Sequence, residues 1–149
     1  MKITGTISAL LQNKGAQVCS VAPETAVFDA IRLMAEKNIG ALVVTSGGQV
    51  VGVFSERDYT RKVALLGRSS KETKVTEIVS APVISADPDS SIEDCMRLMT
   101  NHRIRHLPVL EGGKLVGIVS IGDLVNWIIS TQSQEIDQLK TYITGQYPG

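Results

Sequence analysis

The chain has 149 residues, 43% of them hydrophobic and 4% aromatic, and its 15 basic side chains balance 15 acidic ones. This composition is typical of one soluble domain with an aliphatic core, and the balanced charge excludes a broad positive field for nucleic acid or an anionic membrane. No apolar run is long enough for a transmembrane helix or a signal peptide, and two cysteines are too few for a disulfide framework, so we expect a cytoplasmic protein.

The first elements are predicted from turn residues and apolar periodicity. A short strand is expected around Gln17–Val21, and a helix from about Ala26 to Lys37, where apolar residues recur at i, i+3, i+4 and i+7. The runs ALVVT and VVGVF flank Gly47–Gly48 and therefore predict an antiparallel hairpin. A second helix is expected over about Glu56–Leu66, ended by Gly67.

The same series of elements occurs a second time. A shift of 65 residues aligns Val18–Tyr59 with Val83–Leu124 without a gap, and 16 of the 42 aligned pairs are identical. In the second copy Ser90 and Glu93 predict a capping box at the start of the first helix, and the runs HLPVL and LVGIV flank another pair of glycines. We divide the chain into an amino-terminal segment (1–16), a first repeat (17–67), a linker with a short helix (68–81), a second repeat (82–130) and a carboxy-terminal helix and tail (131–149).

Each copy is predicted to be a β-α-β-β-α unit, so the fold class is α/β (α+β). One such unit buries too little apolar surface to be stable alone, and we expect the two to pack through their sheets about a pseudo-twofold axis, which creates two related clefts. The carboxy-terminal helix continues an apolar stripe beyond the repeat. This stripe covers either a partner protomer in a homodimer or, like the apolar segment Ile7–Leu11, the protein's own module. It consists of Val125, Ile128, Ile129, Gln132, Ile136, Leu139 and Ile143.

Both copies carry the same motifs in the same order. V-x-S-V-x-P or V-I-S-A-D-P is followed by an apolar helix, by I-G-A-L-V-V or I-R-H-L-P-V, by the glycine turn, and by V-G-V-F-S-E-R-D or V-G-I-V-S-I-G-D. Over about Gln17–Ile129 the chain resembles the cystathionine-β-synthase (CBS) domain family. The resemblance is strongest to small bacterial members that consist of one CBS pair, called a Bateman module.

The resemblance implies a regulatory protein without catalytic activity. Members of this family hold AMP, ADP, ATP, NAD(H) or S-adenosylmethionine in the clefts between repeats and signal energy or redox state to an enzyme or transporter, here a separate and unknown effector protein. A ligand-independent dimerisation or scaffold module is the alternative function. A weak nucleic-acid binder is less favoured because the overall charge is balanced. Its candidate residues would be Arg97, Arg103, Arg105 and Lys114.

A Ser-x-x-Asp motif lies where the last strand of each copy meets the last helix, as Ser55 with Asp58 and as Ser120 with Asp123. The amides that begin the helix and the serine hydroxyl suit a phosphate, and the aspartate suits the paired hydroxyls of a ribose. The alternative is an ordinary helix cap, in which the serine accepts a hydrogen bond from a backbone amide. Duplication within a family pattern favours ligand binding, most strongly at Asp123.

The resemblance implies further cleft residues. The positions of Arg105 and His106 commonly reach toward phosphates in this family, and the strand that follows the linker lines the base pocket. The first repeat has Gly40 and Ala41 at the two cationic positions, so Arg57 is its partial replacement. The alternatives are a solvated strand-edge charge for Arg105 and plain core for the strand residues. The candidate set is completed by Val83, Ile84 and Ser85 of the second copy and by Val18, Cys19 and Ser20 of the first.

No metal site or catalytic centre is predicted. His102 and His106 stand four apart, but the stretch H-R-I-R-H lacks the glutamate of a zinc-protease helix and adds two cations. Cys19 and Cys95 lie in apolar patterns and are expected to be packing residues. The sequence therefore favours a regulatory adenosine-binding module over an enzyme.

Overall fold

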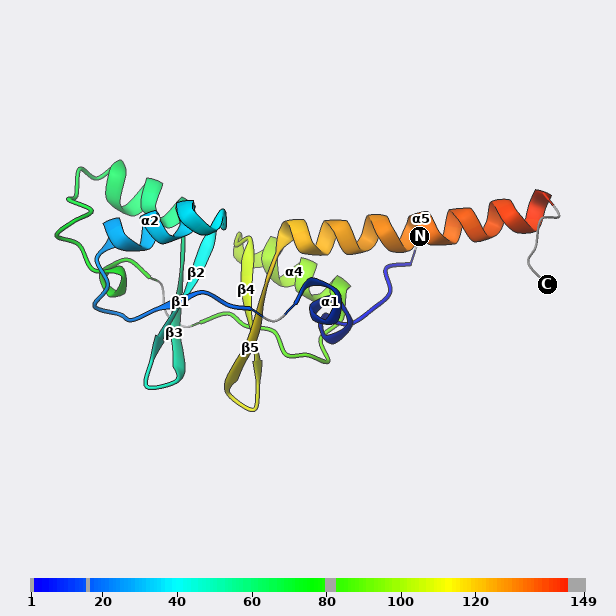
Figure 1. Ribbon diagram of the computed structural model, residues 1–149, viewed down its shortest axis with the longest axis horizontal. Coiled ribbons are helices and arrows are strands. Elements are labelled where there is room, and N and C mark those ends of the chain that lie inside the picture. Colours follow the sequence, from blue (N-terminus) through cyan, green and yellow to red (C-terminus); the bar gives the residue numbers. More distant parts are fainter. Residues whose placement is uncertain (1, 16, 80–82, 145–149) are drawn as a thin grey trace.

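The structure of the protein, a computed structural model, describes residues 2–15, 17–79 and 83–144, and all of their side chains except those of 135 and 141–144. Two mixed α/β units lie side by side, and one long helix extends away from them (Figure 1). The elements are α1 (Ile7–Lys14), β1 (Ser20–Val21), α2 (Val27–Lys37), β2 (Ala41–Ser46), β3 (Gln49–Ser55), α3 (Glu56–Tyr59), α4 (Ile92–His102), β4 (His106–Glu111), β5 (Lys114–Ser120) and α5 (Ile121–Thr144). Two irregular helical turns, η1 (Thr60–Ala64) and η2 (Val75–Glu77), complete the chain.

The two predicted hairpins form as expected. β2 pairs antiparallel with β3, and β4 pairs antiparallel with β5. Both turns need two successive residues with positive φ, which are Gly47 (57°) and Gly48 (80°) in the first hairpin and Gly112 (57°) and Gly113 (82°) in the second. Only glycine adopts such angles at little cost, which is why the Gly-Gly pair marks the tip of each hairpin.

The first strand of each copy is shorter than predicted. β1 covers only Ser20–Val21, parallel to β2, and its counterpart in the second copy is reduced to one isolated parallel bridge between Ala86 and Val109. The reason lies in β4. In the first copy the amide of Val43 donates to the carbonyl of Cys19 (3.2 Å), but Val43 is replaced by Pro108, which has no N–H to donate.

The helix after β3 also departs from its prediction. It begins at Glu56, but after Tyr59 it continues as the π-helical turn η1, in which the amide of Leu65 donates to the carbonyl of Thr60 (3.0 Å). The hydroxyl of Thr60 donates to the carbonyl of Glu56 (3.1 Å) at the point where the helix changes. Such side-chain donation to a carbonyl one turn back commonly bends helices.

The predicted capping box of the second copy is wrong by one residue. The cap of α4 is Ser91, whose Oγ accepts from the amide of Asp94 (3.0 Å). Ser90 instead accepts from the amide of Asp87 (3.1 Å) in the preceding turn, and Glu93 pairs with Arg97 (2.8 Å) along the helix. Ser90 and Ser91 are adjacent and either hydroxyl could cap the helix, so the sequence pattern alone did not distinguish them.

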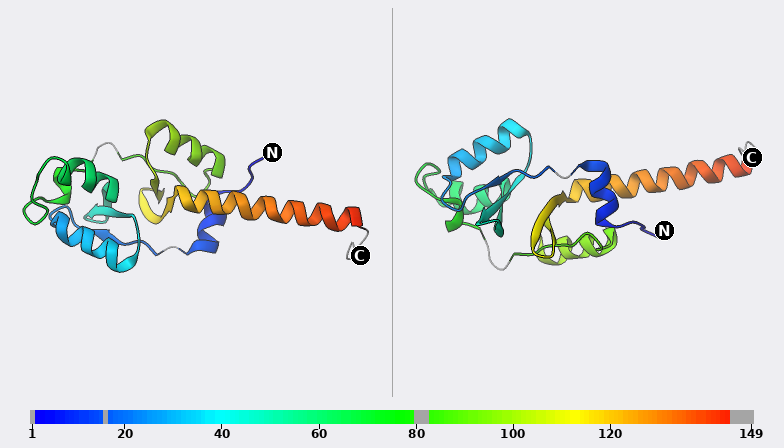
Figure 2. Two further views of the ribbon diagram at one scale, coloured as in Figure 1. Left: turned by 90° about the horizontal axis from the view of Figure 1, so that it is seen from above. Right: turned by 60° about the horizontal axis from the view of Figure 1, so that its bottom comes forward.

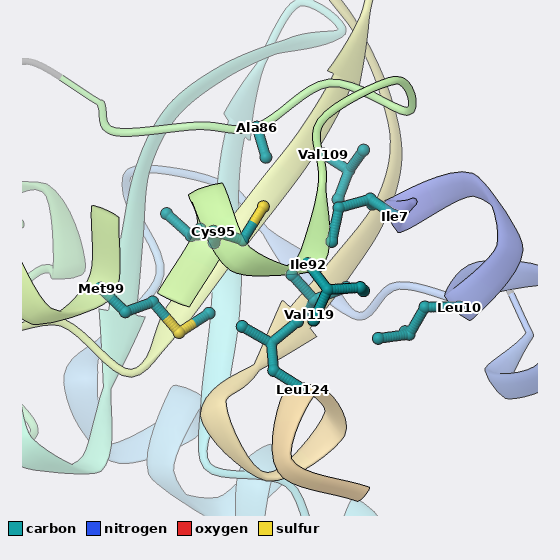
Figure 3. Packing of buried hydrophobic residues seen from close by; sticks show 10 residues of the cluster. Ile7, Leu10, Ala86, Ile92, Cys95, Met99, Val109, Val119 and Leu124 are labelled. Atoms are coloured by element: carbon teal, nitrogen blue, oxygen red, sulfur yellow. The ribbon is translucent and has the colours of Figure 1, made fainter. Parts of the chain in front are cut away.

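Each repeat has its own apolar core, and the amino-terminal helix belongs to the second. Ile7 and Leu10 of α1 are buried against Ile92, Val119 and Leu124, as Figure 3 shows. The segment before the first repeat in the sequence therefore packs on the second repeat in the structure. The first core consists of Val27, Ala30, Met34, Leu42, Val44, Phe54, Val63, Val75 and Ile78.

The interpretation that the carboxy-terminal helix packs on its own module is confirmed for its first part, and the homodimer stays a prediction for the rest. The beginning of α5 packs on its own module, where Leu124 is buried and Trp127 Nε1 donates to the carbonyl of Thr4 (2.8 Å). Beyond this the helix projects away from both repeats (Figure 2). Ile136 and Leu139, on the projecting part, are 47% and 59% exposed. The side chain of Ile143 lies outside the described residues.

Candidate functional site

A cavity of about 370 Å³ lies between the two repeats. It is built from the carboxyl end of β3, the start of α3, the segment after the linker and the loop that joins α4 to β4. Both repeats thus contribute to one cleft, as the pseudo-twofold arrangement predicts. The lining residues are Gly40, Val53, Ser55, Glu56, Arg57 and Asp58 of the first repeat and Val83, Ile84, Arg103, Ile104, Arg105 and His106 of the second.

Two acidic residues, Glu56 and Asp58, line this cleft at the strand-to-helix junction of the first repeat, and Asp58 is the one held by the junction serine. Asp58 Oδ2 accepts from the amide (2.9 Å) and hydroxyl (3.0 Å) of Ser55, and the amide of Asp58 donates to Ser55 Oγ (3.2 Å). Lys62 Nζ lies 3.5 Å from Asp58 Oδ1. The junction is therefore a helix cap whose carboxylate also faces the cavity, so the capping and the ligand-binding interpretations are compatible.

The helix start offers less to a phosphate than predicted. The amide of Glu56 already donates to the carbonyl of Gly40 (3.1 Å), and the amide of Asp58 donates to Ser55. The second junction repeats this arrangement, because the amide of Ile121 donates to the carbonyl of Arg105 (2.8 Å). An anion in the cavity must consequently rely on side-chain cations rather than on these amides.

The cationic groups come from both repeats. Arg105 directly precedes β4, which begins at His106, and Arg103 caps the end of α4 in the left-handed conformation (φ 54°). Arg57 of α3 donates to the carbonyl of Arg103 (3.4 Å). The cations of the second repeat therefore face the acidic residues of the first. Arg105 and His106 lie at the junction of their own repeat, where His106 pairs with Ser120 and the carbonyl of Arg105 accepts from Ile121, and the packing of the two repeats brings Asp58 to them as well.

His106 lies at the centre of the charged groups. Burial holds the pKa of His106 below its ordinary value, and the charges of Lys14 and Arg105 act in the same direction, whereas those of Asp123 and Asp58 oppose it. The imidazole is therefore neutral at pH 7 in the protein without ligand, and a bound phosphate would favour its protonation.

The second predicted junction has a different environment. Asp123 Oδ2 accepts from the amide of Ser120 (2.8 Å) and from Lys14 Nζ (2.5 Å). Partial burial by itself raises the pKa of Asp123, but the hydrogen bonds from Lys14 and Ser120 and the charge of Lys14 bring it below its ordinary value. Asp123 lines a smaller hollow of about 310 Å³ between α1 and α5, together with Trp127 and Asn126.

The other predicted residues lie apart from the cavity. Within the described part of the chain, Val18 and Cys19 are half-buried beside β1, Ser20 is exposed, and Ala41 is buried opposite Ser55 in the sheet. Ser85 follows the two cavity-lining residues Val83 and Ile84 and is half-buried. The strand residues of the second copy thus form an apolar wall of the cavity, whereas those of the first copy do not.

Sequence reasoning missed Lys14 and gave Arg103 no place in the cleft. Arg103 stands two residues before Arg105, and this proximity could have indicated it. Lys14 lies outside the repeats, 109 residues from Asp123, and no sequence signal pairs the two.

The described residues give little support to a metal site or to a nucleophilic cysteine. His102 ends α4 in an exposed position, whereas His106 begins β4, and no group of three potential metal ligands occurs in the described ranges. Burial raises the pKa of the Cys95 thiol to about 11, so it is a packing residue rather than a nucleophile. No helix of the described residues combines the length and apolar character that a membrane span requires.

Comparison with known proteins agrees with this architecture. The sequence matches the CBS domain family over residues 16–65 and 75–130. It is 38% identical over 153 residues to the mitochondrial CBS domain-containing protein CBSX3 of Arabidopsis thaliana, with 95% of this chain and 73% of that protein covered.

Solved structures show the same fold. A protein with CBS domains from Burkholderia ambifaria MC40-6, described as a candidate signal-transduction protein, is 50% identical, with a TM-score of 0.82 over 86% of this chain and 96% of the other. The hexameric CBS-CP12 protein from bloom-forming cyanobacteria is 29% identical, with a TM-score of 0.74 over 84% and 72%. Two family matches, one in each half of the sequence, and a shared fold have one explanation: the chain belongs to the CBS-domain family and consists of two tandem CBS repeats.

Proposed function

We propose that the cavity between the repeats binds an adenine nucleotide and that the protein is a regulatory sensor of that nucleotide. The observation that carries the proposal is the convergence of two acidic residues, Glu56 and Asp58, with three cations beside an apolar wall. The cations are Arg57, Arg103 and Arg105. A nucleotide has three parts with matching chemistry: a flat base, a ribose diol and an anionic phosphate chain. The neutral ribose sits between the other two, so the Asp58 carboxylate need not approach the phosphates.

The chemistry of each part can be assigned to named residues. Val83, Ile84 and Ile104 present apolar surface to the base. Asp58 Oδ2 is occupied by Ser55, whereas Oδ1, which lies 3.5 Å from Lys62 Nζ, has a further acceptor site for the ribose hydroxyls. Arg105 gives the phosphates a charge-assisted partner. A free adenosine would keep the first two contacts and lose the third.

The regulatory effect would be a population shift. Both repeats line the cavity, so a bound nucleotide stabilises their closed arrangement as far as it binds that state more tightly than others. At a hundredfold excess over its Kd a ligand contributes about 2.7 kcal/mol to the state that binds it. This is enough to change which surface a separate effector protein meets.

Calorimetric titration of adenosine, AMP, ATP, NADH and S-adenosylmethionine into the protein tests the proposal. At least one nucleotide should bind. Arg105→Ala should lower the affinity for a phosphorylated ligand by about tenfold, which is the contribution of one charge-assisted hydrogen bond, and should leave the affinity for adenosine unchanged. Lys37→Ala, which removes an exposed cation from α2, is the matched control. Failure of a folded protein to bind any of these ligands would leave Ser55 and Asp58 as a helix cap only.

A second candidate function, a dimerisation module, is favoured by α5. Val125, Ile129, Ile136 and Leu139 are 40%, 56%, 47% and 59% exposed, and their spacing of four, seven and three residues places them on one seam of a coiled coil. A second copy of this chain would present the same seam, and the related CBS-CP12 protein is hexameric. We propose a homodimer in which the projecting parts of two α5 helices pair.

Sedimentation equilibrium distinguishes this arrangement from a monomer. Ile129→Lys should weaken the homodimer by at least about tenfold, because it places a charge at the centre of the apolar seam. Gln134→Lys adds the same charge at an exposed position of the same helix outside the seam and should leave the association unchanged. Equal association of both variants would show that α5 does not form the interface.

A further inference from the structure

The pseudo-twofold relation of the repeats defines where a second cleft must lie. The shift of 65 residues relates Val53 and Asp58, which line the cavity, to Ile118 and Asp123. Lys14 Nζ donates to both of these counterparts, to the carbonyl of Ile118 (2.8 Å) and to Asp123 Oδ2 (2.5 Å). The ammonium group of Lys14 therefore lies where the second cleft would present its ribose acceptor.

The position of Lys14 is fixed by the packing of α1. Ile7 and Leu10 are 0% and 3% exposed within the second core. Leu11 packs so closely on β5 that a Cβ added to Gly117 would lie 2.8 Å from its methyl carbon. Lys14 is the last residue of α1, where a cation is also favoured by the helix dipole. The ammonium group is thus held by a docked helix and not by a loose tail.

The two junctions differ in how their carboxylates are neutralised. Lys62, the cation near Asp58, stands four residues along the same helical segment, and it does not line the cavity. Lys14 comes from another element, 109 residues away, and lies beside Asp123 with side-chain exposures of 34% and 22%. The ammonium group of Lys14 therefore resembles a bound ligand of Asp123, because it can leave the carboxylate only when α1 moves.

We propose that Lys14 is a built-in occupant of the second cleft, which engages the Asp123 carboxylate and restricts nucleotide binding to the first cleft until α1 is displaced. This inference rests on the proposed function of the first cleft. It accounts for two nearly identical junctions of which Asp58, but not Asp123, lines the cavity that both repeats share. Regulation follows directly, since whatever moves α1 would change the number of nucleotides that the protein holds.

The test is calorimetric titration of AMP and ATP into wild-type protein and Lys14→Met, which removes the ammonium group but keeps an apolar stem of similar length. The wild type should bind one nucleotide per chain and Lys14→Met two, and the first event should persist because no residue that lines the first cavity also lines the hollow beside Asp123. Lys37→Met is the matched control and should bind one.

A second variant keeps the inference testable if Lys14→Met folds poorly. Leu11→Ala retains Lys14 but removes the contact with Gly117 that docks the end of α1, and it should also expose a second binding event. Binding of two nucleotides by the wild type, or of one by both variants, would overturn the inference and leave the first cleft intact. If no form binds AMP or ATP, the proposed function itself fails, and the occupancy inference fails with it. A single event that appears only in the variants would support the closure of the second cleft and refute binding in the first.

Discussion

Asp58→Asn lowers the affinity for nucleotide by about ten- to a hundredfold, if the cleft binds the ribose as proposed. A hydrogen bond to a charged acceptor contributes about 1.5–3 kcal/mol, and each 1.4 kcal/mol is a factor of ten in Kd. The amide of asparagine is nearly isosteric with the carboxylate and still offers an acceptor to Ser55, so the cap of α3 is largely preserved. Calorimetry with the tightest-binding ligand measures the change.

Two further variants locate the effect. Asp29→Asn removes one negative charge from an exposed pair with Arg32 on α2 and should leave the affinity unchanged, which excludes a general change in net charge. Asp123→Asn alters the equivalent junction of the second repeat, where Lys14 already holds the carboxylate. A large loss of nucleotide affinity in Asp123→Asn, with no loss in Asp58→Asn, would place the nucleotide in the other cleft and contradict the proposed site.

The duplication made much of the fold predictable from the sequence. Both hairpins follow from Gly47–Gly48 and Gly112–Gly113, because only these positions combine β-rich flanks with freely available positive φ. α2 follows from apolar residues on one helical face, whose members Val27, Ala30 and Met34 are buried. These are local properties, and a repeat shows each of them twice.

The parts that could not be predicted depend on contacts between distant segments. The sequence placed Arg105 and His106 with the junction of their own repeat, where they lie, but it did not predict that the assembled module also brings them to Asp58 of the other repeat. The contact of Lys14 with Asp123 similarly depends on α1 docking on the second repeat. Pairing across such separations is set by how the sheets and helices pack, which no local pattern encodes.

One local signal was present and its consequence was missed. Pro108 stands where Val43 stands in the first repeat, and a proline cannot donate to a neighbouring strand. The loss of that donor leaves Val83–Ser85 unpaired as a strand, with the pairing limited to Ala86. The freed segment contributes Val83 and Ile84 to the cavity wall. A departure from regular pairing thus coincides with the candidate binding site.

Phe54→Ala should lower the free energy of unfolding by about 3–5 kcal/mol, because Phe54 is the largest fully buried side chain among the described residues. Phe54 is fully buried in β3, pairs with Leu42 across the sheet, and belongs to the core of the first repeat. Alanine leaves a cavity that neighbouring aliphatic side chains fill only in part. Such a loss is a large share of the about 5–15 kcal/mol by which domains are stable. Urea denaturation followed by circular dichroism measures it.

Val51→Ala provides the control, because Val51 lies on the same strand but is 37% exposed, and it should change the stability by less than about 1 kcal/mol. Phe54 also directly precedes Ser55. The cavity left in the first core should therefore displace the junction and weaken nucleotide binding at urea concentrations below the unfolding transition. If Phe54→Ala and Val51→Ala unfolded at the same urea concentration, the first repeat would not depend on this core. If Phe54→Ala were destabilised but bound nucleotide normally, the position of Asp58 would be set by its cap with Ser55 and not by the packing beneath it.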